Sequence, residues 1–199
     1  MKNDEVCIST FLVGEWTNVM VKKHFDGKSL FRTEMLVSPS LSRWSLFRCA
    51  VEHAEKSGDD DVIVVCFNEH NFTNNFDGRL FLDVIVEASK RGAQLLIGGC
   101  QKVENMVPVT SSLFWVDVTS GASFYVVYRS VYRKILSITI DGGDADLDEI
   151  ISQYIPNKFL VCPIISDSSM QDSASSDVNS AQETMNIYKT IIAKYNLLS

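Results

Sequence analysis

The sequence lacks any long apolar run, and no stretch approaches the ~20 consecutive apolar residues that a membrane-spanning helix needs. Positive charge is also scarce, with 18 lysines and arginines against 25 acids and a net charge of −7. An acidic surface repels phosphate backbones, so we expect no nucleic-acid partner. Acids precede the first apolar run at the N-terminus, which is not the pattern of a signal peptide.

Paired metal-binding spacings are absent as well. The five cysteines have no short spacing between them, and the three histidines stand in different segments. A zinc site needs paired cysteines or histidines, so none is expected. Most of the cysteines stand in or beside apolar runs, where cysteine behaves as a small buried hydrophobe. Unpaired cysteines favour a reducing compartment, and we expect a cytoplasmic protein.

Apolar patterns in the first half predict strands and helices in alternation. Residues 61–67 (DVIVVCF) form a continuous apolar run, which is typical of a strand covered on both faces. We therefore expect residues 62–66 to be a central strand with a paired neighbour on each side. Helical spacing predicts helices over residues 41–56 and 79–91, and residues 94–98 (QLLIG) read as the next strand. This alternation predicts an α/β fold with a mixed, mostly parallel sheet flanked by helices.

The second half is less regular. Residues 113–118 (LFWVDV) and 124–128 (FYVVY) read as strands, candidates for antiparallel additions at an edge, and residues 158–165 (KFLVCPII) read as the last strand. Residues 166–180 are rich in Ser, Asp and Asn and read as a polar connector, and residues 181–198 carry the apolar stripe of a C-terminal helix. We expect all 199 residues to form one domain.

Five segments, taken in order, resemble lipooligosaccharide-type glycosyltransferases and their small bacterial relatives. Residues 62–73 (VIVVCFNEHNFT) resemble that family's apolar strand followed by three acids, a histidine and Phe-Thr. Residues 88–99 (ASKRGAQLLIGG) match a helix end and a strand that closes on Gly-Gly. Residues 108–136 match a Trp-containing strand and the run after it, and residues 162–166 (CPIIS) and 176–178 (SDV) match the family's closing elements.

The resemblance implies a GT-A fold, which is a Rossmann-like mixed sheet that binds a nucleotide-sugar. It implies an enzyme that moves a hexose from a nucleoside diphosphate donor to a saccharide acceptor in surface-polysaccharide or lipooligosaccharide assembly. Peripheral association with a membrane is compatible with that role. By the same resemblance, the donor would be bound by Asn68, Glu69, His70, Ser176 and Asp177.

One departure from the family concerns its metal. In such enzymes the acidic loop binds Mn²⁺ or Mg²⁺, which neutralises the donor's pyrophosphate, but here Phe67, Asn68 and Glu69 replace the three acids. Glu69 and Asn68 still offer oxygen ligands, whereas Phe67 offers only a backbone carbonyl. Two readings remain open, a transferase and a non-catalytic binding or regulatory relative. If no metal acts, Arg129 and Arg133 are the first cations expected to offset the charge of the leaving diphosphate.

An acidic turn over residues 141–149 adds a second group of candidates. Its spacing matches a calcium loop poorly, so its acids either cap a helix or take part in catalysis. Asp146 and Asp148 are the candidates for the catalytic base or for orienting the acceptor. Ligands of open α/β sheets bind beyond the carboxyl ends of the strands. We therefore expect this turn to share a cleft with residues 68–70 and part of residues 166–178.

Overall fold

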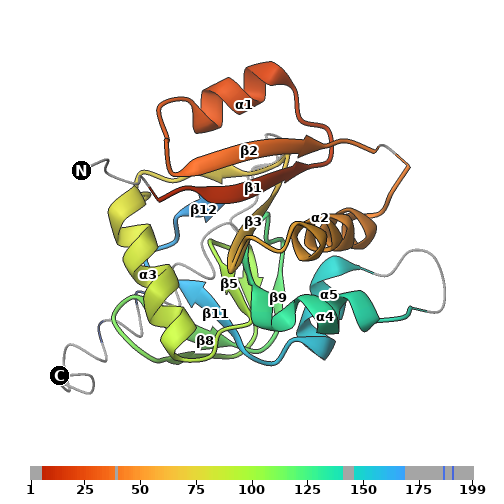
Figure 1. Cartoon of the computed structure of the whole chain (residues 1–199). Helices are drawn as coiled ribbons and strands as arrows, with labels where there is room; N and C mark the ends of the chain where they lie inside the picture. Colours follow the sequence, from red (N-terminus) through yellow and green to blue (C-terminus); the bar gives the residue numbers. More distant parts are fainter. Residues whose placement is uncertain (1–5, 39, 141–145, 169–185, 187–189, 191–199) are drawn as a thin grey trace.

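The computed structural model describes residues 6–38, 40–140, 146–168, 186 and 190. Its centre is an eight-stranded sheet (Figure 1). In spatial order the strands are β2 (Phe31–Leu36), β1 (Ile8–Val13), β3 (Val62–Phe67), β10 (Phe124–Tyr128), β5 (Leu95–Ile97), β11 (Lys158–Val161), β8 (Leu113–Val116) and β7 (Met106–Pro108). β10 and β8 run against the other strands. The predicted fold class, an α/β fold with a mixed, mostly parallel sheet flanked by helices, is confirmed.

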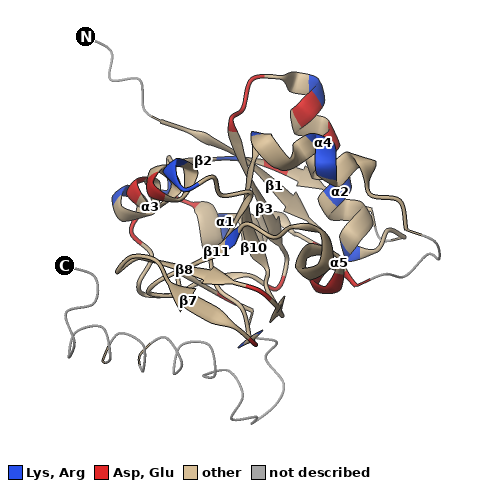
Figure 2. Cartoon of the chain, turned by 90° about the horizontal axis from the view of Figure 1, so that it is seen from below, with Lys and Arg blue, Asp and Glu red and all other residues tan. Residues whose placement is uncertain are grey.

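Helices cover both faces of this sheet (Figure 1). One face carries α2 (Arg43–Ser57), α4 (Arg129–Ser137) and α5 (Leu147–Tyr154), and the other carries α1 (Asn18–Phe25) and α3 (Gly78–Lys90). The predicted helices over residues 41–56 and 79–91 are thereby confirmed. Charged residues lie mostly on the helices, while the strands are mostly uncharged (Figure 2).

β3 is central, as its apolar run predicts. It pairs in parallel with β1 and antiparallel with β10. Ile63, Val65 and Phe67 pack into the core under α2, and Val64 and Cys66 pack into the core on the opposite face. Each of these five side chains is at most 1% exposed. The run shows no polar alternation because helices shield both faces of the sheet from water.

The prediction that residues 124–128 are an edge strand is wrong. β10 lies between β3 and β5 in the middle of the sheet, and all its residues are buried. An antiparallel strand in this position needs the same two-sided burial as its parallel neighbours, so its sequence, FYVVY, carries no polar alternation. The predicted strand over residues 158–165 is shorter than expected, because β11 ends at Val161.

Two short ribbons hold the loops at one end of the sheet. β4 (Asn71–Phe72) pairs with β12 (Ser166–Asp167), and β6 (Lys102–Val103) pairs with β9 (Thr119–Ser120). In the described part of the chain, no helix combines the length and the apolar character that crossing a bilayer requires. The predicted connector beyond residue 168 and the predicted C-terminal helix lie outside the described residues, apart from Asn186 and Thr190, which are both helical.

A close backbone approach follows the Gly-Gly pair at the end of β5. Gly98 O accepts hydrogen bonds from the backbone N–H groups of Ile165 and Ser166, at 2.9 and 3.2 Å. A Cβ on Gly99 would overlap the carbonyl group of Ser166. This contact requires glycine, because the obstacle is backbone and not the end of a flexible side chain.

We expect Gly99→Ala to lower the free energy of unfolding by about 1–3 kcal/mol, the usual cost of forcing extra volume into a packed region. Gly78→Ala is the matched control, because a Cβ there meets only Leu30, at 3.7 Å, and the residue is helical. Alanine should be neutral or stabilising at that position. Urea denaturation of both variants measures the difference, and equal stabilities would contradict the proposed overlap.

Candidate active site

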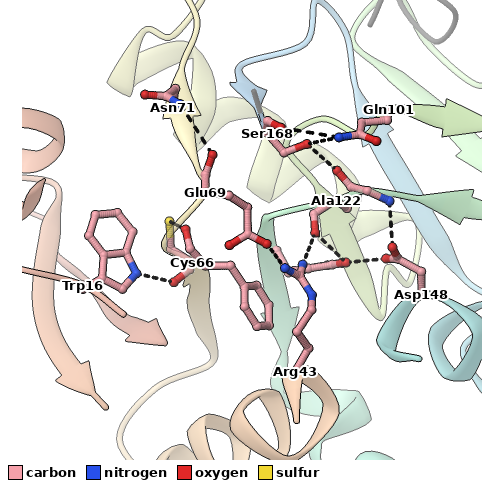
Figure 3. Close-up of polar contacts among 12 residues, drawn as sticks. Trp16, Arg43, Cys66, Glu69, Asn71, Gln101, Ala122, Asp148 and Ser168 are labelled. Atoms are coloured by element: carbon pink, nitrogen blue, oxygen red, sulfur yellow. Dashed lines mark hydrogen bonds and ion pairs between the residues drawn. The ribbon is translucent and has the colours of Figure 1, made fainter. Parts of the chain in front are cut away.

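A cleft of about 1050 Å³ lies beyond the carboxyl end of β3. It is bounded by the start of α2, the loop after β3, the β6–β9 ribbon and the start of α5 (Figure 3). This is the end of the sheet at which open α/β folds bind ligands. Each of the three predicted segments contributes to the lining, through Glu69, Asp148 and Ser168 respectively. The charged and amide side chains in the lining are Arg43, Glu69, Gln101, Lys102, Asp146, Asp148, Glu149 and Gln153.

Arg43 is held from three sides at the start of α2. Its guanidinium forms an ion pair with Glu69 and donates a hydrogen bond of 2.8 Å to the carbonyl oxygen of Ala122. The same group lies over the ring of Phe67, 4.0 Å from the ring centroid. These three contacts fix the guanidinium in place. At 39% exposure, the Arg43 side chain still reaches the cleft.

Asp148 is held in the cleft by two hydrogen bonds. Its Oδ1 accepts a hydrogen bond of 2.7 Å from the Tyr125 hydroxyl, and its Oδ2 accepts one of 2.7 Å from the backbone N–H of Gly121 (Figure 3). Burial raises the pKa of Asp148 above its ordinary value, and the hydrogen bonds from Tyr125 and Gly121 act in the opposite direction. A carboxylate with a raised pKa and a fixed orientation is suited to accept a proton from a bound hydroxyl group.

Asp146 has a different role from Asp148. It is exposed and caps α5, where its Oδ1 accepts hydrogen bonds from the backbone N–H groups of Asp148 and Glu149, at 2.8 and 3.2 Å. These bonds satisfy N–H groups that have no partner within the helix. Of the two predicted catalytic acids, Asp146 positions the helix that carries Asp148. The rest of the acidic turn, residues 141–145, lies outside the described residues.

His70 does not reach the cleft. Its side chain is fully buried, with ring centroids 4.3 Å from Phe72 and 5.0 Å from Phe124. Nδ1 lies 2.7 Å from the Ser166 hydroxyl. Burial, with the nearby charges of His24 and Lys28, lowers the pKa of His70 to about 3. The structure therefore places this predicted donor-binding residue in the aromatic core, where no donor in the cleft can contact it.

Asn68, another predicted donor-binding residue, does not line the cleft either. Asn68 is half-buried beside Gly14, where an added Cβ would meet its side-chain oxygen, and it is not part of the described cleft lining. Ser176 and Asp177 lie outside the described residues. Of the five predicted donor-binding residues, Glu69 is thus the one that the described structure places in the cleft.

The loop after β3 does not fit a divalent cation. Mn²⁺ and Mg²⁺ require several oxygen ligands, but the Glu69 carboxylate already pairs with Arg43, and Asn68 lies apart from the cleft lining. Across residues 6–38, 40–140 and 146–168, no group of three or more His, Cys, Asp or Glu side chains is arranged to hold a metal ion.

Two residues of this site were not predicted. A lone arginine at the start of a helix resembles many surface arginines, so Arg43 gave no local signal. Tyr125 did give one, because a tyrosine inside a buried apolar strand needs a hydrogen-bond partner for its hydroxyl group. That partner is Asp148.

Comparison with known proteins shows the fold of the chain and leaves its family open. No family model and no curated protein sequence matches it. Among solved structures, A197 from STIV is similar with a TM-score of 0.61 and 13% identity, over 82% of this chain and 86% of that one. An apo UDP-glucose pyrophosphorylase has a TM-score of 0.48, with 8% identity over 92% of this chain and 82% of that one.

A glycosyltransferase involved in glycosylation of the major capsid of PBCV-1 has a TM-score of 0.43, with 9% identity over 77% of this chain and 81% of that one. At 13% identity, the likeness to A197 supports an argument about fold and none about activity. The two likenesses with TM-scores below 0.5 support no argument. The resemblance to lipooligosaccharide-type enzymes remains a prediction from the sequence.

Proposed function

We propose that this chain is a glycosyltransferase that moves a sugar from a nucleoside diphosphate donor to a hydroxyl group of a saccharide acceptor. The GT-A-like sheet, the cleft at the carboxyl end of β3 and the sequence resemblance around that strand support this function. The proposed acceptor belongs to a surface polysaccharide or a lipooligosaccharide.

The observation that carries the proposal is a short chain of contacts joining a cation to a base across the cleft. Arg43 donates to the carbonyl oxygen of Ala122, at 2.8 Å, and the Tyr125 hydroxyl lies 3.2 Å from that oxygen and 2.7 Å from Asp148 (Figure 3). Sugar transfer from such a donor needs a cation and a base in one site. The cation offsets the charge of the departing diphosphate, and the base takes the proton from the hydroxyl group of the saccharide.

The roles of these groups follow from the bonds that change. The bond between the donor's anomeric carbon and the diphosphate oxygen breaks, and its electron pair leaves on the diphosphate. The acceptor oxygen forms a bond to that carbon and gives its proton to the Asp148 carboxylate. Arg43 faces the charge that builds up on the diphosphate.

Polar groups suited to sugar hydroxyls line the same cleft. Gln101 Nε2 donates to the Ser168 hydroxyl at 3.2 Å, and this hydroxyl donates to the carbonyl oxygen of Gly121 at 2.8 Å. The backbone N–H of Gly121 also donates to Asp148, so the Gly121 backbone connects Gln101 and Ser168 to the proposed base. Amide and hydroxyl groups fixed in this way can orient a neutral saccharide beside Asp148.

A non-catalytic nucleotide-sugar-binding protein is the second candidate. The ion pair between Arg43 and Glu69 favours it, because the glutamate in the family's metal-binding position is already engaged. The two candidates differ in turnover and not in binding.

We expect at least one nucleoside diphosphate sugar to raise the melting temperature of the protein. A ligand at 100 times its Kd adds about 2.7 kcal/mol to the free energy of unfolding. The measurement is a thermal-shift panel of nucleotide-sugars, each with EDTA or with Mn²⁺, followed by assays of sugar transfer and of donor hydrolysis. Binding without turnover would favour the non-catalytic candidate, and a panel with no binding would remove both.

A further inference from the structure

We propose that Arg43, oriented by Glu69, binds the donor's diphosphate directly and takes the place of a divalent cation. This inference rests on the proposed function and specifies how its site recognises phosphate. It assigns Glu69 to holding an arginine where the related sequence motif would hold a metal.

The first step of the argument concerns the carboxylate. Glu69 is 19% exposed and forms an ion pair with Arg43, so its charge is neutralised within the protein. A metal at this loop would have to break that pair, with no second acid in the Phe67-Asn68-Glu69 motif to add to its ligands. Arg43 thus supplies the positive charge that Glu69 needs, and the loop requires no metal ion.

The second step concerns the free capacity of the arginine. A guanidinium carries five N–H donors in a planar fork that matches two phosphate oxygens. Contacts with Glu69 and with the carbonyl oxygen of Ala122 leave donors available for a ligand. The ring of Phe67 supports one face of the group at 4.0 Å, and at 39% exposure the side chain still faces the cleft. Little conformational freedom remains to be lost on binding, which favours affinity.

The third step concerns the other cations of the chain. Arg129 and Arg133, which the sequence suggested for this task, follow β10 at its opposite end, because Tyr128 pairs with Val62 at the start of β3. Arg129 donates to the carbonyl oxygen of Gly58, and Arg133 pairs with Glu55. Among the described residues, the cations that line the cleft are Arg43 and Lys102. Of these two, Arg43 is the one held in place by contacts with Glu69, in the loop after β3, and with Ala122.

The experiment measures binding of UDP and of inorganic pyrophosphate by calorimetry, in EDTA and in Mn²⁺. We expect the wild-type protein to bind both probes in EDTA, with no more than a threefold gain in Mn²⁺. Arg43→Gln should weaken binding about tenfold to a hundredfold, the range for losing hydrogen bonds from a charged group. Arg43→Lys keeps the charge without the planar fork. Its affinity for both probes should lie between those of the wild type and of Arg43→Gln.

Arg48→Gln is the matched control, because Arg48 lies on the same helix and donates to a carbonyl oxygen, that of Leu136, outside the cleft. It should bind both probes as the wild type does. Binding that requires Mn²⁺, and that Glu69→Gln abolishes while Arg43→Gln does not, would overturn the inference and leave the transferase proposal standing. A wild-type protein that binds neither probe in EDTA would also overturn it.

The two proposals can fail separately. If no nucleotide-sugar binds, but pyrophosphate binds in EDTA and Arg43→Gln removes that binding, the Arg43 site is supported and the transferase proposal alone falls. Circular dichroism and melting temperatures of the Arg43 variants show whether lost binding reflects lost structure.

Discussion

Asp148→Asn is expected to lower the turnover of the sugar donor by about 10²–10⁴-fold, the usual contribution of a positioned general base. The amide cannot accept the acceptor's proton, although it keeps nearly the same size. Donor affinity should change by less than threefold, because in the proposed site Arg43 and not Asp148 contacts the diphosphate. Steady-state kinetics together with calorimetry of the donor separates the loss of turnover from any loss of binding.

Asp146→Asn distinguishes between the two predicted catalytic acids. Asparagine caps helices about as well as aspartate does, so α5 and its hydrogen bonds from Asp148 and Glu149 should persist. Turnover should then fall far less than in Asp148→Asn. A larger loss in Asp146→Asn would move the base assignment to the exposed acid.

Tyr125→Phe adds a test through the pH profile. The hydrogen bond from Tyr125 lowers the pKa of Asp148, against the larger effect of burial, which raises it. Removing that hydroxyl group should therefore raise the pKa further. Because the base must be ionised, the acid limb of kcat should move to higher pH. A shift to lower pH would show that Tyr125 does not act through Asp148.

Local signals explain which parts of the fold were predictable. The buried run of β3 and the helical spacing of α2 and α3 are each contained in one segment, and each was predicted correctly. The central position of β10 was missed because pairing between distant strands leaves no mark in a short window. The Arg43–Glu69 pair was missed for the same reason, as it joins a helix start to a loop in another part of the sequence.

The motif around Phe67 shows where a family pattern misleads. By the family pattern alone, restoring an acid with Phe67→Glu is expected to rebuild part of a metal site. Phe67 is only 1% exposed, however, and ends a core strand under the Arg43 guanidinium. A glutamate there would place a charge in the apolar core. The same motif placed His70 in a donor site, although its ring packs between Phe72 and Phe124.

We expect His70 to make the protein sensitive to acid. The folded state holds the buried imidazole neutral, with its pKa lowered to about 3, first by burial and then by His24 and Lys28. In the described structure its Nε2 is buried with no hydrogen-bond partner. The unfolded chain takes up a proton near the ordinary histidine pKa of about 6.5. Below that pH the unfolded state binds more protons than the folded state, so stability falls as the pH falls from about 6.5 towards 3.

One such proton lowers the free energy of unfolding by up to about 1.4 kcal/mol per pH unit, or by about 1.6 kcal/mol between pH 6.5, where the unfolded histidine is half protonated, and pH 5. Urea denaturation across this range should show that slope in the wild type and a smaller slope in His70→Phe, whatever the absolute stability of the variant. His53→Phe is the control, because the His53 side chain is 49% exposed.

The difference between the wild-type and His70→Phe slopes isolates the buried imidazole. The pKa of His24 is also lowered, first by burial and then by Lys23 and Lys28, so His24 also makes the protein less stable in acid. Because His24 is present in both proteins, its contribution cancels in the difference. Asp148 acts in the opposite direction, because its raised pKa makes the folded state bind a proton more readily than the unfolded chain does. Equal slopes in wild type and His70→Phe, with a reduced slope in His53→Phe, would place the acid sensitivity at the surface and remove His70 from this role.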